Sequence, residues 1–348
     1  SEMCIRDSPF IIIYILEPSM IKRADWSLRH SQFVFSSIEN MNKHLKKYSR
    51  SVDIFYDEAL KVFEEIDTQF NIINVFSHAE TGVKETWDRD NYVRKFFKFK
   101  NKKFLITGGT GTLGLAIAEK FRSMGSEVIL LDVNKKQLED QNLKKKFSLY
   151  FCDVTRRESF KKVLDHICLD YGGLDFVISN AGNAHQSEIA KLNDSELKKS
   201  FELNFFAHQI VASESVELMR TQNIGGCLLF NISKQAINPG KDFGAYGTSK
   251  AALLALCKQY ALEYGGINIR SNGVNADRVE SGLLTKTMIN KRSKSRKITS
   301  DEYLQSNLLK KKVLAEDVAE AFYNLSISKK TTAAILTVDG GNIEASLR

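Results

Sequence analysis

From Lys103 onward, short runs of β-branched and apolar residues alternate with longer amphipathic stretches. This alternation is typical of repeated βαβ units, in which helices cover both faces of one parallel sheet. Strands are expected near residues 103–107, 127–132, 147–152, 174–180, 226–232, 267–274 and 334–338. Helices are expected near residues 112–124, 156–171, 194–220, 244–264 and 315–327. The predicted fold class is α/β, with a doubly wound parallel sheet of seven strands.

The first hundred residues have a different character. No glycine occurs before Gly82, and charged amphipathic stretches such as Ile38 to Glu65 dominate. They predict a mostly helical N-terminal segment over residues 9–100, with one strand at Phe70 to Phe76. Residues 3–8 spell MCIRDS, which a sequencing-library adapter encodes in one reading frame, so we expect residues 1–8 to be an artefact. The α/β domain is expected over residues 101–348.

Composition excludes several classes of function. Basic residues outnumber acidic ones by 50 to 42, but they are scattered, which argues against a nucleic-acid partner. The longest apolar run, Phe10 to Leu16, is far shorter than the roughly 18 residues that cross a bilayer, so no membrane span is predicted. Five cysteines without CxxC spacing favour a reduced, cytoplasmic protein. His30, His44 and His78 lack HxH or HxxxH spacing, and no metal site is predicted.

A glycine-rich turn, TGGTGTLG, follows the first predicted strand directly and leads into a helical pattern. Glycines permit a tight turn and a close approach of the backbone to a pyrophosphate, which free N–H groups at the helix N-terminus then stabilise. We therefore expect a Rossmann-type fold that binds a nicotinamide dinucleotide, although such a turn also occurs without a ligand. The expected contacts are Gly108, Gly109, Thr110, Gly111, Thr112, Leu113 and Gly114.

The second predicted strand ends in an acidic residue, Asp132, 18 positions after Gly114. A carboxylate about 20 residues beyond the glycine turn accepts hydrogen bonds from the adenosine ribose hydroxyls. Because it repels a 2′-phosphate, the sequence favours NAD over NADP as cofactor. Lys135 and Lys136 follow closely and would offset the repulsion. A solvated carboxylate at a strand end is the alternative explanation.

Tyr246 and Lys250 are four positions apart at the start of a predicted helix, and they therefore share one face. A phenol with a reference pKa of about 10 is poorly matched to general acid–base catalysis near neutral pH. An adjacent ammonium favours the phenolate, so we expect Lys250 to lower the pKa of Tyr246. The spacing alone is common on solvated helix surfaces, and only its context indicates a catalytic pair.

Three other polar positions supply that context. The fifth predicted strand leads to Ser233, whose hydroxyl is 13 positions before Tyr246 and could hold a substrate oxygen beside the phenol. Upstream, the fourth strand ends in a Ser-Asn-Ala-Gly segment at residues 179–182. Asn204 lies within the predicted helix 194–220, where a buried asparagine otherwise bonds only the backbone.

Together, these motifs resemble those of the short-chain dehydrogenase/reductase family over about residues 102–348. The resemblance implies an NAD(P)-dependent oxidoreductase with the catalytic residues Asn204, Ser233, Tyr246 and Lys250. It implies that Asn204 positions a proton-relay water and that Lys250 also holds the nicotinamide ribose. By the same resemblance, the further cofactor contacts are Asp153, Val154, Asn180, Ala181, Gly182, Val279 and Ser281.

Longer segments are similar to the dehydrogenase half of bifunctional aldolase/short-chain dehydrogenases, which handle rhamnulose-1-phosphate and lactaldehyde. These segments are FNISKQAINPG, QYALE, NADRVESGLL, AEDVAEAF and the C-terminal LTVDGGN with SLR. The similarity implies hydride transfer between a small sugar-derived alcohol or hydroxy aldehyde and its carbonyl or acid product. An aldolase half would precede the dehydrogenase, and residues 9–100 would then be its remnant, although they show no metal site.

Two departures from the family pattern keep alternatives open. Thr112 stands where the family has glycine, which is closer to the extended members that epimerise or reduce nucleotide sugars. Ala276 and Asp277 replace the usual Pro-Gly, which also fits a sensor that binds NAD without turnover.

The expected partners are a small alcohol or carbonyl substrate and further copies of the chain. Residues 283–300 are strongly basic where the family covers its substrate, and they and Lys234 would attract an anionic group. A solvated charged face is the alternative. Surplus apolar residues in helices 194–220 and 244–264 predict a homodimer or homotetramer.

Overall fold

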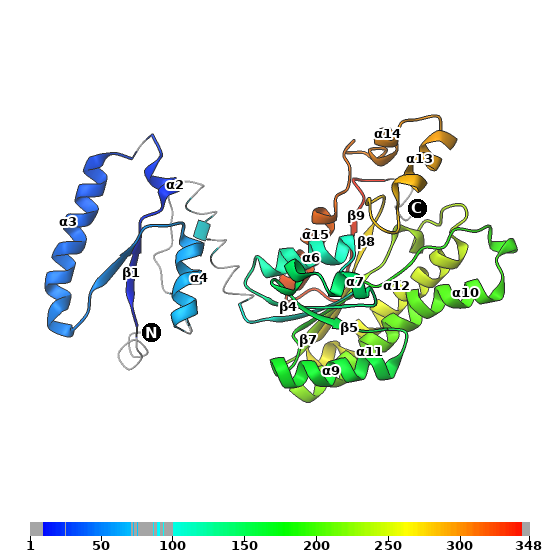
Figure 1. The fold of residues 1–348 in the computed structure, drawn as a ribbon, viewed down its shortest axis with the longest axis horizontal. Coiled ribbons are helices and arrows are strands. Elements are labelled where there is room, and N and C mark those ends of the chain that lie inside the picture. Colours follow the sequence, from blue (N-terminus) through cyan, green and yellow to red (C-terminus); the bar gives the residue numbers. More distant parts are fainter. Residues whose placement is uncertain are drawn as a thin grey trace. The chain divides into compact units, whose positions relative to one another are not determined.

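The computed structural model of the protein describes residues 10–24, 26–70 and 100–342, together with residues 72, 75, 86, 89, 90 and 93. They belong to two compact units, which divide between residues 98 and 99 (Figure 1). The expected artefact at residues 1–8 and most of the strand expected at residues 70–76 lie outside the described residues. Within the described part of the chain, no helix combines the length and apolarity that a membrane crossing requires.

The N-terminal unit contains a small parallel sheet that the sequence did not predict. Its strands are β1 (Ile12–Ile15) and β2 (Val52–Phe55), and the long helix α3 (Leu28–Leu45) lies between them in sequence. A crossover of this kind is what a parallel pair requires. Apart from this sheet, the regular elements that the structure describes in this unit are helical, as expected, and include α2 (Pro18–Ile21) and α4 (Ala59–Gln69). Strands this short carry too little alternation to be distinguished from irregular chain.

The second unit is built on seven parallel strands in the order β5-β4-β3-β6-β7-β8-β9, and this confirms the predicted fold class. Every predicted strand is present within two residues of its expected ends. The bounds are β3 (Lys103–Thr107), β4 (Glu127–Asp132), β5 (Ser148–Phe151), β6 (Phe176–Ser179), β7 (Gly226–Asn231), β8 (Ile269–Ala276) and β9 (Ile335–Val338). The strand order reverses beside β3, so the carboxyl ends of β3 and β6 border the crevice where doubly wound folds bind ligands.

Helices cover both faces of this sheet, as Figure 1 shows. One face packs against α6 (Thr112–Arg122) and α15 (Ala315–Ile327) through an apolar core that includes Phe121 and Phe322. The other face packs against α9 (Arg157–Tyr171), α11 (Ala207–Gln222) and α12 (Gly244–Tyr264). Because both faces are covered, most of the strands are apolar runs without alternation, and the polar residues of β8 are the exception.

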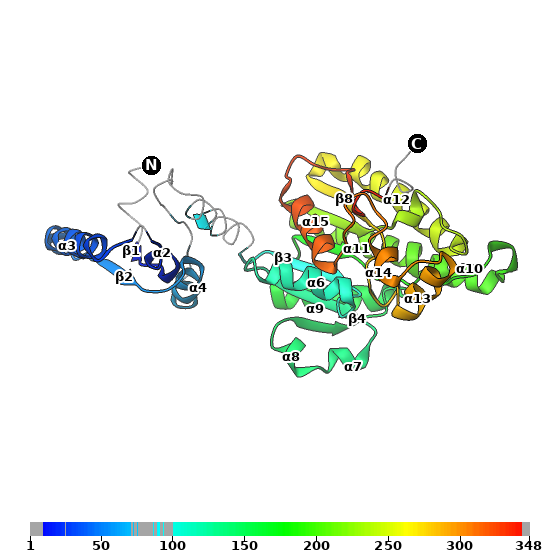
Figure 2. The same cartoon turned by 90° about the horizontal axis from the view of Figure 1, so that it is seen from above.

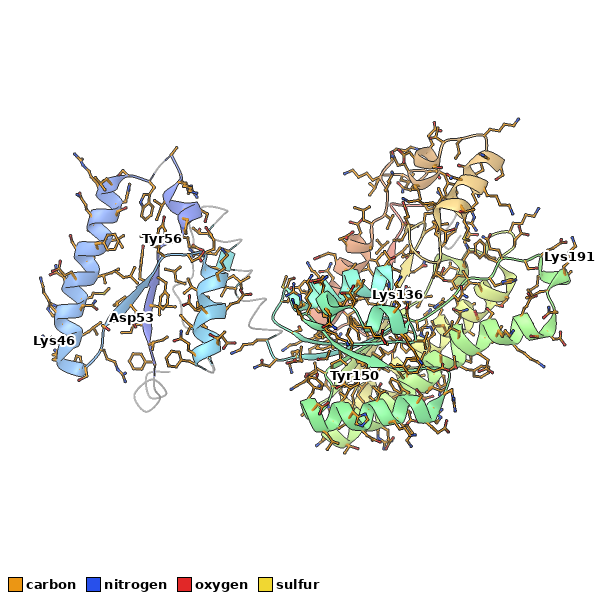
Figure 3. All side chains as sticks on the ribbon, viewed as in Figure 1. Lys46, Asp53, Tyr56, Lys136, Tyr150 and Lys191 are labelled. Atoms are coloured by element: carbon orange, nitrogen blue, oxygen red, sulfur yellow. The ribbon has the colours of Figure 1, made fainter. Side chains whose placement is uncertain are left out.

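Four short helices were not predicted. Helices α7 (Lys135–Leu138) and α8 (Gln141–Lys144) lie along the β5 edge (Figure 2), and α13 (Lys286–Ser295) and α14 (Ser300–Leu304) follow β8. On the edge strand β5, Tyr150 faces α9 (Figure 3), where its hydroxyl donates to Asp170 at 2.8 Å. All four helices are held by caps and local packing, and such short elements have little periodicity to detect.

The predicted helix over residues 194–220 is interrupted. It consists of α10 (Asp194–Phe201), a π-helical turn η3 (Glu202–Phe206) and α11. The N–H of Ala207 donates to the carbonyl of Glu202, five residues earlier, which defines the wider turn. Asn204 lies in the middle of this turn and is 1% exposed. The turn therefore directs a buried amide toward the carboxyl end of β6.

Candidate active site

The glycine-rich turn between β3 and α6 is shaped by contacts that no side chain could tolerate. Gly108 has a φ of +61°, and a Cβ there would lie 2.9 Å from the Cα of Ala181. A Cβ at Gly114 would lie 2.3 Å from the Gly108 carbonyl oxygen. Helix α6 begins after Gly111 with no side-chain cap, and Gly111 and Thr112 are exposed. The first N–H groups of α6 therefore face open space, as a pyrophosphate site requires.

The segment after β6 is tied to this turn by hydrogen bonds. The Thr107 hydroxyl accepts from the backbone N–H groups of Asn180 and Ala181 at 3.0 and 3.1 Å. The Asn180 side chain donates to the carbonyls of Thr107 and Gly108, both at 3.1 Å, and accepts from Asn231 at 2.8 Å. These bonds hold the carboxyl ends of β3, β6 and β7 in one arrangement, with Gly182 next in the chain.

Asp132 closes the other side of the turn. Its Oδ2 accepts from the N–H and hydroxyl of Thr110 at 3.1 and 2.7 Å. Its Oδ1 accepts from the N–H groups of Val133 and Asn134 at 2.8 and 3.1 Å. Four donors thus fix the carboxylate at the end of β4, at the edge of the crevice. The side chain of Thr110 is turned toward Asp132 and away from the start of α6.

The predicted cofactor residues Asp153, Val154, Val279 and Ser281 lie in the loops that follow β5 and β8. Asp153 accepts from the N–H and hydroxyl of Thr155 at 3.0 and 2.6 Å, which shapes the loop after β5. Val154 and Val279 are 6% and 7% exposed and belong to the two apolar cores. The hydroxyl of Ser281 accepts from the backbone of residues 283 and 284 at 3.3 and 3.4 Å. These contacts fix the loops after β5 and β8.

Tyr246, Lys250 and Ser233 converge at the carboxyl ends of β6 and β7. The Tyr246 hydroxyl is in hydrogen-bonding reach of Ser233, which lies two residues after the end of β7. The Lys250 ammonium lies 5.9 Å from the centre of the Tyr246 ring. It donates to the carbonyl of Asn231 at 2.8 Å. Tyr246 is 7% exposed and Lys250 is 2% exposed, so both side chains are almost completely shielded from solvent.

The pKa of Tyr246 differs from the sequence-based expectation. Burial raises the pKa of this phenol, and the hydrogen bond from Ser233 lowers it by less. Burial also lowers the pKa of Lys250 to about 7. The expected lowering of this pKa by the adjacent ammonium is wrong, because burial of the phenol outweighs it and the ammonium bonds the Asn231 carbonyl. Desolvation therefore moves the two pKa values in the directions opposite to those of an exposed pair.

Asn204 joins this group from the π-helical turn. Its Oδ1 accepts from the Asn183 N–H at 3.0 Å, and its Nδ2 donates to the Asn183 carbonyl at 2.8 Å. A Cβ on Gly182 would lie 3.0 Å from this Oδ1 and 3.7 Å from the Lys250 Nζ. Gly182 therefore lets the amide and the ammonium approach the same stretch of backbone.

Two residues of this site were not predicted from the sequence. Asn231 supplies both a side-chain donor to Asn180 and the carbonyl that Lys250 binds. His208, 1% exposed, contacts Lys250 through Nε2 at 3.4 Å. A weak signal existed for His208, because Ser200, Asn204 and His208 recur every four residues in an otherwise mixed helix. Nothing in the sequence indicated a role for Asn231, because strand patterns are recognised from apolar residues and asparagine is rare in strands.

Helices α13 and α14 lie next to the segment that precedes Tyr246. The Arg292 guanidinium lies 4.6 Å from the centre of the Phe243 ring, and that ring is 6.2 Å from the Tyr246 ring. Arg292 also donates to the Tyr303 hydroxyl at 3.0 Å. The other basic residues of α13, such as Lys291 and Lys294, are exposed. Figure 3 shows Lys191 at the outer tip of the loop before α10.

Comparison with known proteins decides the family. The sequence profile described as short chain dehydrogenase matches residues 102–292, more than half of the chain. The chain belongs to the short-chain dehydrogenase family. It is thus an oxidoreductase on a nucleotide-binding Rossmann-type fold. An uncharacterized oxidoreductase, YuxG of Bacillus subtilis, is 32% identical over 70% of this chain. The match spans only 38% of that longer relative.

Solved structures of short-chain dehydrogenases share the fold. A 3-ketoacyl-(acyl-carrier-protein) reductase from Brucella melitensis, complexed with NADH, superposes with a TM-score of 0.63 at 21% identity. It covers 70% of this chain and 98% of that one. ElxO, with NADP bound, superposes with a TM-score of 0.63 at 22% identity, over 70% of this chain and 98% of that one. The two neighbours carry different dinucleotides, so the fold implies NAD(P) dependence without selecting one form.

The residues present fit such a dinucleotide. The glycine turn offers uncapped N–H groups. Gly108 and Gly114 have no side chains that could block access to them. Thr112, which replaces the usual glycine of the short-chain dehydrogenases, is exposed at the start of α6 and does not fill the turn. Ala276 and Asp277 replace the usual Pro-Gly. Asp277 accepts a hydrogen bond from Asn342 at 2.7 Å and lies 3.9 Å from Lys234.

Proposed function

We propose that the chain interconverts an alcohol or hydroxy aldehyde with its carbonyl or acid product by hydride transfer, with Tyr246 as the acid–base group. The observation that carries this proposal is the buried convergence of the Tyr246 and Ser233 hydroxyls beside Lys250. The test is an activity screen of the full chain with NAD and NADP against lactaldehyde, short polyols and sugar phosphates. Binding of dinucleotide without turnover of any substrate class would indicate a sensor and overturn the proposal.

The roles of the residues follow from their chemistry. A bound nicotinamide dinucleotide supplies or accepts the hydride. Tyr246 exchanges a proton with the substrate oxygen, and the Ser233 hydroxyl donates a hydrogen bond to that oxygen. Lys250 places a positive charge behind the phenol and holds a ribose hydroxyl, and Asn204 orients the water that relays the proton. Burial of the group strengthens each of these electrostatic contacts.

We further propose that the cofactor is NAD. Asp132 supports this, because four donors hold its carboxylate at the end of β4, where its charge would repel a 2′-phosphate. Asp132→Asn removes the charge, and we expect the ratio of kcat/KM for NAD to that for NADP to fall about tenfold or more. Steady-state kinetics with both dinucleotides measure this ratio. Glu139→Gln, an exposed carboxylate in the same loop, is the control and should leave the ratio unchanged.

We propose that the substrate is a small sugar derivative with an anionic group, and that Arg292 binds this group. Arg292 is the basic side chain of α13 that packs over Phe243, next to Tyr246. Guanidinium groups bind carboxylates and phosphates through paired hydrogen bonds. Arg292→Gln should raise KM for anionic substrates about tenfold and change KM for neutral polyols little. Lys291→Gln changes an exposed neighbour, and equal effects of the two variants would contradict this assignment.

The resemblance to the dehydrogenase half of aldolase/short-chain dehydrogenases is also a proposal. It is supported by the length of the Bacillus subtilis relative, of which the match covers 38%. On this view residues 9–100 form a unit of their own, left from an upstream domain, and residues 101–348 form the dehydrogenase.

We propose that the protein works in the cytoplasm as a homodimer or homotetramer. The exposed apolar side chains of Phe206 and Leu262, which are 47% and 79% exposed, support self-association through the α11 and α12 side of the domain.

A further inference from the structure

A buried histidine lies behind the proposed catalytic lysine. His208 is on the first turn of α11, four residues after Asn204, and its ring is enclosed between α11, α12 and β6. Its Nδ1 is 2.6 Å from the hydroxyl of Ser179, and its Nε2 is 3.4 Å from the Nζ of Lys250. None of the proposed catalytic roles uses this imidazole.

The partners of the ring determine where its proton is. A lysine ammonium has donors only, so the nitrogen that faces Lys250 must be the acceptor. The proton of the neutral imidazole is then on Nδ1, which donates to Ser179. Burial, and then the charge of Lys250, lower the pKa of His208 well below its usual value, while a hydrogen bond with the Ala181 backbone opposes them. The ring is therefore neutral at physiological pH and can accept a hydrogen bond throughout that range.

We propose that His208 is a positioning residue that holds the Lys250 ammonium in place for catalysis, an inference that rests on the proposed function of Lys250. The ammonium has three N–H donors. One is bound by the Asn231 carbonyl at 2.8 Å and a second faces His208 at 3.4 Å. The third remains for a ligand oxygen. Two protein acceptors in fixed positions thus determine the direction of the third N–H.

This contact also favours the charged form of Lys250. A hydrogen bond to the charged form of a group stabilises that form against desolvation. Among the described residues, the titratable groups that face Lys250 are His208 from α11 and Tyr246 from its own helix. The other neighbours, Asn231 and Gly182, are uncharged. Since no carboxylate of the described residues pairs with the ammonium, the loss of the imidazole removes one of the two protein acceptors that stabilise it.

The test is a pH profile of carbonyl reduction by three variants. Activity requires the ammonium, so it declines as pH rises through the pKa of Lys250. In His208→Leu, which keeps the volume but removes the acceptor, we expect this decline about one pH unit lower than in wild type. His208→Gln offers an amide oxygen to Lys250, so its decline should lie close to that of wild type. His166→Leu, which removes an exposed histidine of α9, should show the wild-type profile.

The outcomes separate this inference from the proposed function. If Tyr246→Phe is inactive but His208→Leu, folded by circular dichroism, keeps the wild-type profile, the role of His208 is refuted and the enzyme assignment stands. If Tyr246→Phe is as active as wild type, the proposed function itself fails. Nitrogen-15 NMR of histidine-labelled wild-type protein covers the case of a variant that does not fold. We expect an unprotonated Nε2 in His208 at the pH values where Lys250 is charged, and a protonated Nε2 there would overturn the inference.

Discussion

Replacement of Tyr246 by phenylalanine is expected to lower kcat about 1000-fold while dinucleotide affinity changes less than about threefold. The phenol is almost fully buried and bonds Ser233, so water cannot substitute readily for its hydroxyl. Phenylalanine keeps the ring that packs 6.2 Å from Phe243, and the fold should persist. The loss is measured as kcat on the best substrate of the screen, with dinucleotide binding followed by calorimetry.

The matched control is Tyr264→Phe. Tyr264 is on the same helix and stacks on Tyr260 with a ring separation of 5.5 Å, away from Ser233 and Lys250. This variant should retain wild-type kcat. A Tyr246→Phe variant within about tenfold of wild type would mean that another group exchanges the substrate proton.

Gly114→Ala is expected to weaken dinucleotide binding about 100-fold and to lower the melting temperature. The new Cβ would lie 2.3 Å from the Gly108 carbonyl oxygen and 2.8 Å from the Cα of Gly109. Because both contacts are with backbone, no side chain can rotate away and the turn itself must shift. Overpacking of this kind costs about 1–3 kcal/mol of stability, and the shifted N–H groups no longer match a pyrophosphate.

Gly265→Ala provides the comparison, since a Cβ there meets nothing within 4 Å and its backbone φ is −58°. Its dinucleotide affinity should equal that of wild type. Calorimetric titration with NAD measures both variants. Equal affinities for Gly114→Ala and wild type would show that the pyrophosphate does not lie on this turn.

The sheet could be predicted closely from sequence because most of its strands are dense apolar runs bounded by turns. The residues Phe104 to Ile106, for example, are all apolar and are buried on both faces between α6 and α9. The N-terminal strands are different. Ile12–Ile15 and Val52–Phe55 pair with each other, and four residues of either offer no length over which alternation can be recognised.

The candidate catalytic residues were predicted as a set because Ser233 follows a strand, Tyr246 and Lys250 begin a helix, and all occur in a fixed chain order. The structure brings Ser233, Tyr246, Lys250 and Asn204 together. Their roles remain predictions. The pKa directions could not be predicted, because they depend on burial and on which acceptor Lys250 finds. His208 was missed for the same reason, since its partners Ser179 and Lys250 are 29 and 42 positions away.

The π-helical turn imposes a constraint on chain length. A wider turn accommodates one more residue than an ordinary α-helix, and each added residue rotates the rest of the helix by about 100°. The face that α11 presents relative to α10, and with it the position of the His208 imidazole, is therefore set by the extra residue in Glu202–Phe206. In a homologue that lacks one residue in this span, the helix equivalent to α11 would be rotated about its axis and would present a different face to the lysine. Single-residue gaps at this point in an alignment would then mark enzymes that hold their lysine by different means.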